Sequence, residues 1–460
     1  MNDYYLAIDI GASSVKIILG YLLDDKLHIE EIYRFENKII NKDNHLFWDL
    51  NNLIDQIIIG LKICNKINKI PKYVGIDTFG VDYCLLDDEN CQCLDVYSYR
   101  DNRTKEPFNE IHKKINRIDY FKMTGIQPQS YNTIYQLYHD KMNHKLTRNV
   151  KVVMLSSYLA YYFTGILYNE ATIFSTTGLL DIDSKNINEK LLNILSLTKE
   201  NFPNIVKPGS IVGKFKEDIS KEIGFRPTLI AVCQHDTASA VVASRANNDT
   251  LYLSSGTWSL IGATLSNYSI EKSTYELGFT NELGFNCEYR ILKNITGLWM
   301  IQQVKKENHP LVSIEKIIEL AEKNNTYNDV IDVNDKSFLN PSSMTKAIEN
   351  YLKRNNMRPC DNIGELYYLV YNSLAKSYFN AIKEIEKITN KKYETLNIVG
   401  GGSQNRLLNE LTKKHINKKI ILGPVEATAI GNIIVQMVAN RKISYEMKNE
   451  LLESLKGEKK

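Results

Sequence analysis

Residues 5–20, YLAIDIGASSVKIILG, decide the fold of the first part of the chain. Apolar residues on both sides of the small-residue turn at 11–14 predict a strand, a tight turn and a second strand. Residues 251–263, LYLSSGTWSLIGA, repeat this plan with a turn at 254–257. Two hydroxyl-rich hairpins about half a chain apart predict two related domains that face one ligand.

Between and after these hairpins, strand patterns alternate with helix patterns, which predicts an α/β fold. Residues 50–67 have the pattern of a helix, and residues 72–87 have that of a strand. Apolar residues recur every three or four positions through residues 364–388, which predicts one long amphipathic helix. Residues 396–412 predict a strand, a glycine loop and a helix.

The domain boundary is expected in the polar, turn-prone segment 244–250, SRANNDT. We therefore expect an N-terminal domain at 1–245, a C-terminal domain at 246–445 and a polar C-terminal tail at 446–460. The tail is expected to form a surface helix with a frayed end.

The composition excludes a disordered chain, a collagenous chain and a small chain held together by disulfides. The chain has 460 residues, 43% hydrophobic and 24% charged, as in ordinary soluble globular proteins. Its net charge of +3 is too small to indicate binding to nucleic acid or to an anionic membrane. The nearly uncharged run 152–170 contains Ser, Thr, Gly and Tyr, so we interpret it as buried strand and helix rather than a membrane span. No signal-peptide pattern is visible, so a cytoplasmic location is expected.

The seven cysteines contain no CxxC pair. Cys91 and Cys93 are close in sequence, but no second pair of ligands accompanies them to bind zinc. Reduced, mostly buried thiols are therefore expected.

The first turn has the residues of a phosphate-binding loop. Small side chains let main-chain N–H groups approach phosphate oxygens closely, and Lys16 adds a positive charge. Asp9, at the end of the preceding strand, is placed to hold a hydrated Mg²⁺. A single turn of this kind is usually an ordinary hairpin, but the second turn at Ser254, Ser255 and Thr257 favours a pair of phosphate-binding turns.

The glycine loop at 400–405, GGGSQN, lies between an apolar strand and an amphipathic helix. It is either a tight strand-to-helix turn or a surface on which a flat base or ribose lies against the backbone. Its spacing matches neither the dinucleotide fingerprint nor the P-loop.

Residues 231–240, AVCQHDTASA, predict a strand that ends in polar residues and leads into a small-residue helix. An isolated His-Asp pair is usually a helix cap or a surface pair. At the end of a strand, between two phosphate-binding turns, Asp236 is well placed to act as a general base. Such a base takes a hydroxyl proton as the oxygen attacks a γ-phosphate, and it contributes about 10²- to 10⁴-fold in rate.

Two further polar clusters, at 77–82 and 99–104, are either turns with surface ion pairs or donors and acceptors for a polyol substrate. Trp258 and Trp299 are expected to be core residues rather than stacking platforms.

Eight segments occur in chain order from about residue 5 to 435 and together resemble the FGGY carbohydrate kinases. These segments are DIGASSVK, GIDTFGVDY, YRDNRT, QHDTASAV, SSGTWSLIG, NITGLWMIQ, IVGGGSQNRLLN and GPVEATAIGN. The resemblance is closest to the members that phosphorylate L-rhamnulose at O1 in L-rhamnose catabolism, and QHDTASAV and YRDNRT are the most specific segments for that substrate. Val15, Lys16 and Phe79 depart from the usual family pattern.

The resemblance implies an α/β protein with two ribonuclease H-like domains of the actin and hexokinase type, with ATP and sugar in the cleft between them. It implies that Asp236 is the catalytic base and that Asp9 lies near Mg²⁺. The implied ATP contacts are Ala12, Ser13, Ser14, Val15, Lys16, Thr257, Gln302 and Gly401. The implied sugar contacts are Gly80, His235, Asp236, Thr237 and Asn294.

Alternatives remain at this point. L-Fuculose kinases share TFGVD, HDT and SSGTW, and D-xylulose kinases are a more distant possibility within the family. Proteins of the actin and chaperone type use the same pair of phosphate hairpins, so an ATP-driven switch is the alternative from another class. The oligomeric state is not indicated by the sequence.

Overall fold

The structure is a computed structural model that describes residues 3–87, 95–339 and 341–455. Internal contacts divide the chain into two compact units. Unit 1 consists of Met1–Ala243, Leu265–Arg290 and Ala427–Lys460, and unit 2 consists of Ser244–Thr264 and Ile291–Glu426. The chain first passes between units at residue 244, and two later segments that the sequence places in the C-terminal domain and tail belong by their contacts to unit 1.

Unit 1 contains a six-stranded sheet of order β11-β12-β6-β1-β2-β3. The predicted hairpin is its centre, because β1 pairs antiparallel with β2 and parallel with β6. β12 extends the parallel part of the sheet beyond β6. The strands are β1 (Tyr4–Ile10), β2 (Ser14–Leu23), β3 (Lys26–Glu36), β6 (Pro71–Thr78), β11 (Ser210–Lys214) and β12 (Thr228–Ala231).

Unit 2 repeats this arrangement around the second hairpin, with strands in the order β16-β14-β13-β17-β18. β13 pairs antiparallel with β14 and parallel with β17, which pairs parallel with β18. The predicted duplication within an α/β fold is therefore confirmed. The strands are β13 (Leu251–Ser255), β14 (Trp258–Leu265), β16 (Tyr289–Thr296), β17 (Thr395–Val399) and β18 (Lys419–Leu422).

Three two-stranded sheets, the strand β15 next to β16 and a set of helices complete the fold of the described residues. The remaining strands are β4 (Ile39–Lys42), β5 (His45–Trp48), β7 (Tyr83–Leu86), β8 (Lys151–Met154), β9 (Asn169–Glu170), β10 (Ile205–Val206) and β15 (Thr280–Leu283). The helices of unit 1 are α1 (Leu50–Lys66), α2 (Lys105–Lys114), α3 (Arg117–Thr124), α4 (Thr133–Met142), α5 (Leu155–Thr164), α6 (Ala171–Phe174), α7 (Glu189–Leu195), α8 (Glu217–Ile223), α9 (Asp236–Val242), α10 (Lys272–Glu276), α16 (Ala427–Ala439) and α17 (Lys448–Ser454). The helices of unit 2 are α11 (Trp299–Asn308), α12 (Ile314–Lys323), α13 (Met344–Arg354), α14 (Ile363–Thr389) and α15 (Arg406–Ile416).

Local sequence explains the ends of the predicted helices. α1 begins after Asp49, whose side chain accepts the Asn52 N–H at 3.1 Å and so satisfies one free donor of the first turn. α14 is the predicted long amphipathic helix. It begins after Asn362, which caps the Glu365 N–H, and ends at Asn390 in the left-handed conformation.

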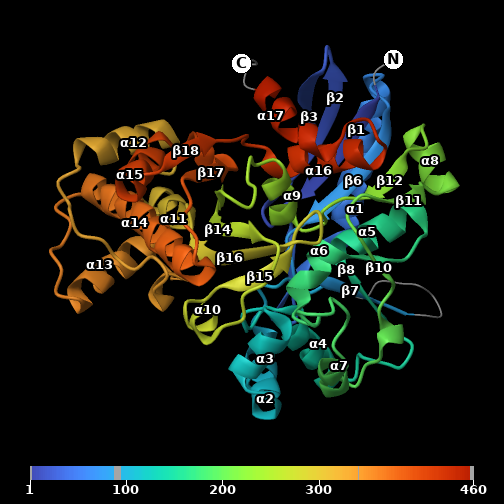
Figure 1. Ribbon diagram of the computed structural model, residues 1–460, viewed down its shortest axis with the longest axis horizontal. Coiled ribbons are helices and arrows are strands. Elements are labelled where there is room, and N and C mark those ends of the chain that lie inside the picture. Colours follow the sequence, from blue (N-terminus) through green and yellow to red (C-terminus); the bar gives the residue numbers. More distant parts are fainter. Residues whose placement is uncertain (1–2, 88–94, 340, 456–460) are drawn as a thin grey trace. The chain divides into compact units, whose positions relative to one another are not determined.

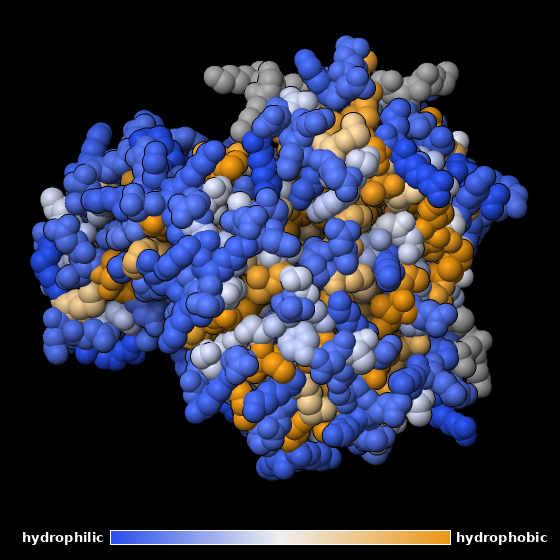
Figure 2. Space-filling view, viewed as in Figure 1, coloured by the Kyte–Doolittle hydropathy of each residue, from blue (hydrophilic) through white to orange (hydrophobic). Residues whose placement is uncertain are grey.

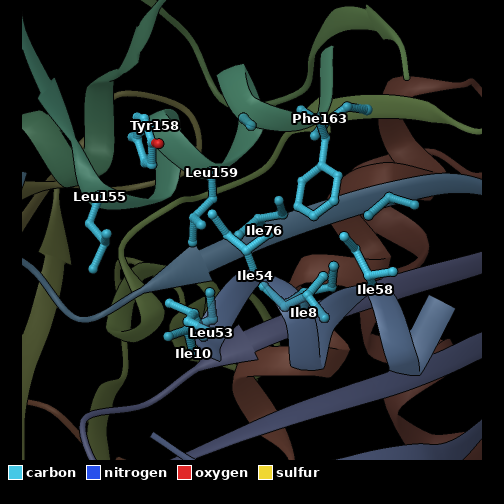
Figure 3. Packing of buried hydrophobic residues seen from close by; sticks show 14 of the residues in the cluster. Ile8, Ile10, Leu53, Ile54, Ile58, Ile76, Leu155, Tyr158, Leu159 and Phe163 are labelled. Carbon is cyan, nitrogen blue, oxygen red and sulfur yellow. The ribbon is translucent and has the colours of Figure 1, made fainter. Parts of the chain in front are cut away.

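The core of unit 1 follows from the alternation of side chains along its central strands. Leu6, Ile8 and Ile10 of β1 and Val74 and Ile76 of β6 join one hydrophobic cluster with residues of α1 and α5. The cluster buries apolar surface at about 25 cal/mol per Å² and so stabilises that face of the sheet. Figure 3 shows part of this cluster and labels among its members Ile8, Ile10, Leu53, Ile54, Ile58, Ile76, Leu155, Leu159 and Phe163.

The opposite face of β1 and β6 is covered by α16, which comes from the other end of the chain. Gly75 of β6 leaves the space into which Asn432 and Gln436 of α16 project. In Figure 1, α16 and α17, in red, lie beside the blue strands of this sheet. The second face of this sheet is thus covered by a helix from the other end of the chain.

Two expectations about elements were wrong. Residues 72–87 form two strands, β6 and β7, rather than one, and the two strands belong to different sheets. The chain turns at Val81, where the Asp82 N–H donates to Gly80 O at 3.0 Å and φ is +70°. Such a three-residue turn is uncommon for a β-branched residue, so the sequence pattern gives no sign of it.

The described part of the polar tail is also more integrated than expected, and the end expected to be frayed, beyond residue 455, lies outside the described residues. α17 packs against β3, and Ser454 Oγ accepts the Leu27 N–H at 3.0 Å. Leu451 and Leu452 are buried. Two apolar residues therefore anchor this helix, although most of the segment is polar.

Within the described ranges, no helix is both long enough and apolar enough to span a membrane. The face seen in Figure 2 is mostly hydrophilic, with hydrophobic areas interrupted by polar side chains. The thiols of Cys64, Cys84, Cys233, Cys287 and Cys360 are free, whereas Cys91 and Cys93 lie outside the described residues.

Gly75 provides a test of the packing between α16 and the sheet. A Cβ at this position would overlap Asn432 Oδ1 and lie 2.6 Å from Val232 Cγ1. We expect G75A to lower the free energy of unfolding by roughly 1–3 kcal/mol, measured as a fall of several degrees in Tm. G401A is the control, because a Cβ there meets nothing within 4 Å. Equal Tm values for both variants would contradict this packing.

Candidate active site

The first group of candidate residues in unit 1 lies on paired strands. In the parallel register, Asp9 of β1 is the partner of Asp77 of β6, so both carboxylates lie on the α16 face. Asp9 is also opposite Lys16 of β2, whose Nζ is 3.9 Å from Asp9 Oδ2. Sheet pairing thus brings two carboxyl groups and one ammonium group together from three strands.

Asp77 is fully buried, and burial raises its pKa well above the usual value. The charges of Asp9 and Asp236 raise the pKa further, whereas the hydrogen bond from Asn432 opposes the shift. Asn432 Nδ2 donates to Asp77 Oδ2 at 2.5 Å, and Gln436 Nε2 donates to Asn432 Oδ1 at 2.7 Å. Asp77 Oδ1 is buried without a hydrogen-bond partner. A cation bound beside Asp77 would favour the ionised form of this acid and could use its free acceptor.

The first turn is closed by a hydrogen bond from the Gly11 N–H to Ser14 O at 3.0 Å. Ala12 and Ser14 are partly exposed and Ser13 is exposed, so this turn is accessible from solvent. Val15 is different, because its side chain is fully buried in the core. Its main chain pairs on both sides, with Ile10 of β1 and Phe35 of β3, so Val15 offers a ligand no exposed surface.

The predicted general base lies at the same edge of this sheet. The Thr78 N–H donates to Gln234 O at 2.9 Å, and Thr78 pairs with His235 in a parallel bridge. His235 Nε2 is 3.5 Å from Asp236 Oδ1, which also accepts the Thr237 hydroxyl at 3.0 Å. The structure therefore brings His235, Asp236 and Thr237 to the end of the strand that carries Asp77.

Gly80 follows β6 and packs against Thr176, whose Oγ1 accepts the Val81 N–H at 3.0 Å. The neighbouring acid, Asp82, is fully buried rather than on the surface. Its Oδ2 accepts the Trp48 Nε1–H at 2.7 Å and the Tyr99 N–H at 3.0 Å. Burial raises the pKa of Asp82 to about 6 against these hydrogen bonds. The interpretation of this cluster as a surface ion pair is wrong, because Asp82 fixes the turn from inside.

Three charged residues of unit 1 were missed by the sequence analysis. Glu170 is buried and accepts the Gln234 N–H at 3.0 Å, and it also caps α6, so it fixes the strand end before His235. Glu282 and Arg290 contact each other and His235. Burial favours the neutral form of Glu282, but the charges and hydrogen bonds of His235 and Arg290 prevail and lower its pKa. No local motif marks these residues, since only the tertiary fold brings them to His235.

In unit 2, the second turn and the glycine loop meet. A Cβ at Gly400 would lie 2.8 Å from Ser255 O, and one at Gly402 would overlap Ser255 Oγ. Gly401 between them is exposed and has open space beside it. The close packing explains the flanking glycines, and the open position at Gly401 fits a flat ligand lying against the main chain.

The other residues expected to bind in unit 2 are all exposed. Thr257 O accepts the Trp299 N–H at 3.1 Å, so this turn adjoins the start of α11, which carries Gln302. Asn294 lies on β16. Trp258 was expected in the core, but it is 41% exposed, and Trp299 is half-buried.

The residues present fit a nucleotide with Mg²⁺. Mg²⁺ is usually bound in proteins by one or two carboxylates together with substrate phosphates. Asp9 and Asp77 supply a pair of carboxylates, and the buried Asp77 Oδ1 has an unused acceptor. Among the described side chains, no group of three or more His, Cys, Asp or Glu residues could hold a metal ion on its own.

Comparison with known proteins identifies the class of protein. The model for the N-terminal domain of the FGGY family of carbohydrate kinases matches residues 4–243, and the model for the C-terminal domain matches residues 251–440. The chain belongs to this family, and it is a sugar kinase.

Curated relatives narrow the comparison further. The chain is 39% identical over 441 residues to the rhamnulokinase of Bacillus subtilis (strain 168). These aligned residues make up 95% of this chain and 91% of that protein. It is 35% identical over 440 residues to the rhamnulokinase of Bacteroides thetaiotaomicron, which covers 95% and 90%.

Solved structures share the fold. A ligand-bound xylulose kinase from Lactobacillus acidophilus matches with a TM-score of 0.81 at 16% identity, covering 98% of this chain and 92% of that one. A Plasmodium falciparum glycerol kinase with ADP matches with a TM-score of 0.75 at 17% identity, covering 98% and 92%. These matches agree with the two-unit α/β architecture.

The environment of Asp77 predicts that D77N affects the stability of the ligand-free protein and the binding of ATP with Mg²⁺ in different ways. D77N removes a buried carboxyl group whose ionisation is opposed by burial and by Asp9, and it keeps an acceptor for Asn432, so we expect the Tm of the ligand-free protein to be unchanged or higher. We expect the rise in Tm produced by ATP with Mg²⁺ to shrink, because the carboxylate facing the ligand is lost. Thermal melts with and without ligand measure both effects. A lower ligand-free Tm with an undiminished ligand effect would contradict this role.

Proposed function

We propose that this chain transfers the γ-phosphoryl group of ATP to O1 of L-rhamnulose and gives L-rhamnulose 1-phosphate. The proposal of phosphoryl transfer rests on one observation. Asp9, Asp77 and Asp236 converge on the ends of paired strands in unit 1. The choice of sugar rests on the rhamnulokinases to which nearly the whole chain is similar.

Asp236 is the proposed general base. Its side chain is 29% exposed, so a substrate hydroxyl can reach it, and the Thr237 hydroxyl orients one carboxylate oxygen. As O1 attacks the γ-phosphorus, its proton passes to Asp236 and the bond from phosphorus to the β-bridging oxygen breaks, which releases ADP. Gly80, His235, Thr237 and Asn294 are the proposed sugar contacts.

The nucleotide contacts are proposed in both units. In unit 1, the main chain of Ala12, Ser13 and Ser14 and the ammonium group of Lys16 hold phosphate oxygens. In unit 2, Thr257, Gln302 and Gly401 hold the nucleotide. Mg²⁺, when bound, neutralises phosphate charge, and Asp9 with Asp77 would hold it.

The substrate is tested by an assay of ADP release with ATP and Mg²⁺ against L-rhamnulose, L-fuculose, D-xylulose, L-ribulose and glycerol, with a blank that contains no sugar. We expect the highest kcat/KM with L-rhamnulose. Faster turnover of another ketose would refute the proposed sugar but keep the kinase chemistry. Equal ADP release in every sample, including the blank, would instead support an ATP-driven switch.

The role of Asp236 is tested by D236N. We expect kcat to fall about 10²- to 10⁴-fold, because the amide cannot accept the O1 proton. ATP affinity, measured by calorimetry, should remain nearly the same. D249N is a suitable control, since Asp249 is an exposed residue paired with Lys391. Retention of more than about a tenth of the parental rate would show that another group is the base.

The nucleotide surface of unit 2 is tested by G401A. Its Cβ enters open space, so the fold should be unchanged while the methyl group hinders a flat ligand. We expect KM for ATP to rise about tenfold with little change in KM for the ketose, a selective loss of ground-state binding. An unchanged KM for ATP would exclude Gly401 from the nucleotide site.

A further inference from the structure

We propose that Glu282 and Arg290 are positioning residues that set the orientation of His235 toward the sugar. This inference rests on the proposed function, because it assigns an effect on the sugar contact. Neither residue lies in a recognisable motif, and both come from the segment Leu265–Arg290, which belongs by its contacts to unit 1.

The three side chains contact one another pairwise. Arg290 Nη2 donates to Glu282 Oε2 at 2.9 Å. The same Nη2 is 3.2 Å from His235 Nδ1, and Glu282 Oε2 is also 3.2 Å from His235 Nδ1. One nitrogen of the imidazole is thus held by both members of an ion pair.

These contacts fix the imidazole ring whichever nitrogen carries the proton. Glu282 can accept from a protonated Nδ1, and the Arg290 guanidinium can donate to an unprotonated one. In both cases Nδ1 is directed at the ion pair, and Nε2 is the nitrogen that faces Asp236 Oδ1, 3.5 Å away. The side chain of His235 is 8% exposed, and Nε2 is its nitrogen that faces the proposed base and a sugar hydroxyl bound beside that base.

The ion pair is itself held in place. The side chain of Arg290 is 0% exposed, and its Nε donates to Leu283 O at 3.2 Å. The Leu283 N–H donates to Ser175 Oγ at 3.0 Å, which ties β15 to the region of α6. A rigid support of this kind is what a precisely oriented binding group requires.

Stability alone does not account for the ion pair. Taking a guanidinium and a carboxylate out of water is costly, and apolar residues of similar size often stabilise a fold equally well or better. The pair lies against one of the proposed sugar contacts, where it can instead fix the direction of a hydrogen bond. A role in positioning explains both its burial and its place.

The test compares E282Q with the parent protein. We expect kcat/KM for the ketose to fall about 10- to 100-fold, mainly through a higher KM, while KM for ATP changes by less than about twofold. R290K serves as a second variant that keeps the charge but loses the planar fork, and the same pattern is expected. E365Q is the matched control, because Glu365 is also buried and paired with an arginine, Arg358 at 2.9 Å, in unit 2.

A double-mutant cycle with H235N separates positioning from general damage. If Glu282 acts through His235, E282Q lowers kcat/KM by less than about twofold in the H235N background. Equal losses in both backgrounds, or equal rises in KM for ATP and ketose, would overturn the proposal.

The ring itself is monitored by ¹⁵N NMR of the histidine side chains, with H235N identifying the signals. E282Q should shift the Nδ1 and Nε2 signals of His235, and E365Q should leave them in place. This readout does not depend on the substrate, so it separates the two claims. A parent protein that phosphorylates no ketose would refute the proposed function, whereas unmoved His235 signals in E282Q would refute the positioning role.

Discussion

The parallel pairing of β1 with β6, continued to β12, is the constraint on which the site of unit 1 depends. Its register places Asp9 beside Asp77 and brings His235 level with Thr78. Because side chains alternate between faces, a shift of one residue would turn the acids toward the apolar cluster on the other side. Burial of the apolar face therefore fixes the strand register, and the same register places the acids on the opposite face.

Placing carboxylates side by side inside a protein is costly, and the chain offsets that cost with groups from distant sequence. Asn432 and Gln436 of α16 form a chain of hydrogen bonds that runs from Asp77 to the main-chain oxygen of Leu6. Gly75 leaves room for both side chains. The C-terminal part of the sequence thus supports an N-terminal site, which is why α16 belongs by its contacts to unit 1.

Local patterns predicted much of this architecture. The two hairpins, the helix α14 and the strand before Asp236 were evident because periodicity and turn chemistry are properties of short segments. The turn at Val81 was not, since it depends on Thr176 far along the chain. Glu170, Glu282 and Arg290 were missed for the same reason, because their partners are separated from them by tens of residues. The burial of α17 was hidden by its polar composition.

A crystal structure of the protein with L-rhamnulose and a non-hydrolysable ATP analogue tests the proposed site most directly. We expect O1 of the sugar to lie within about 2.6–3.2 Å of a carboxylate oxygen of Asp236. We also expect His235 Nε2 to contact a hydroxyl of the same sugar. A sugar bound with no hydroxyl within reach of Asp236 would contradict the central claim that these strand ends form the phosphoryl-transfer site.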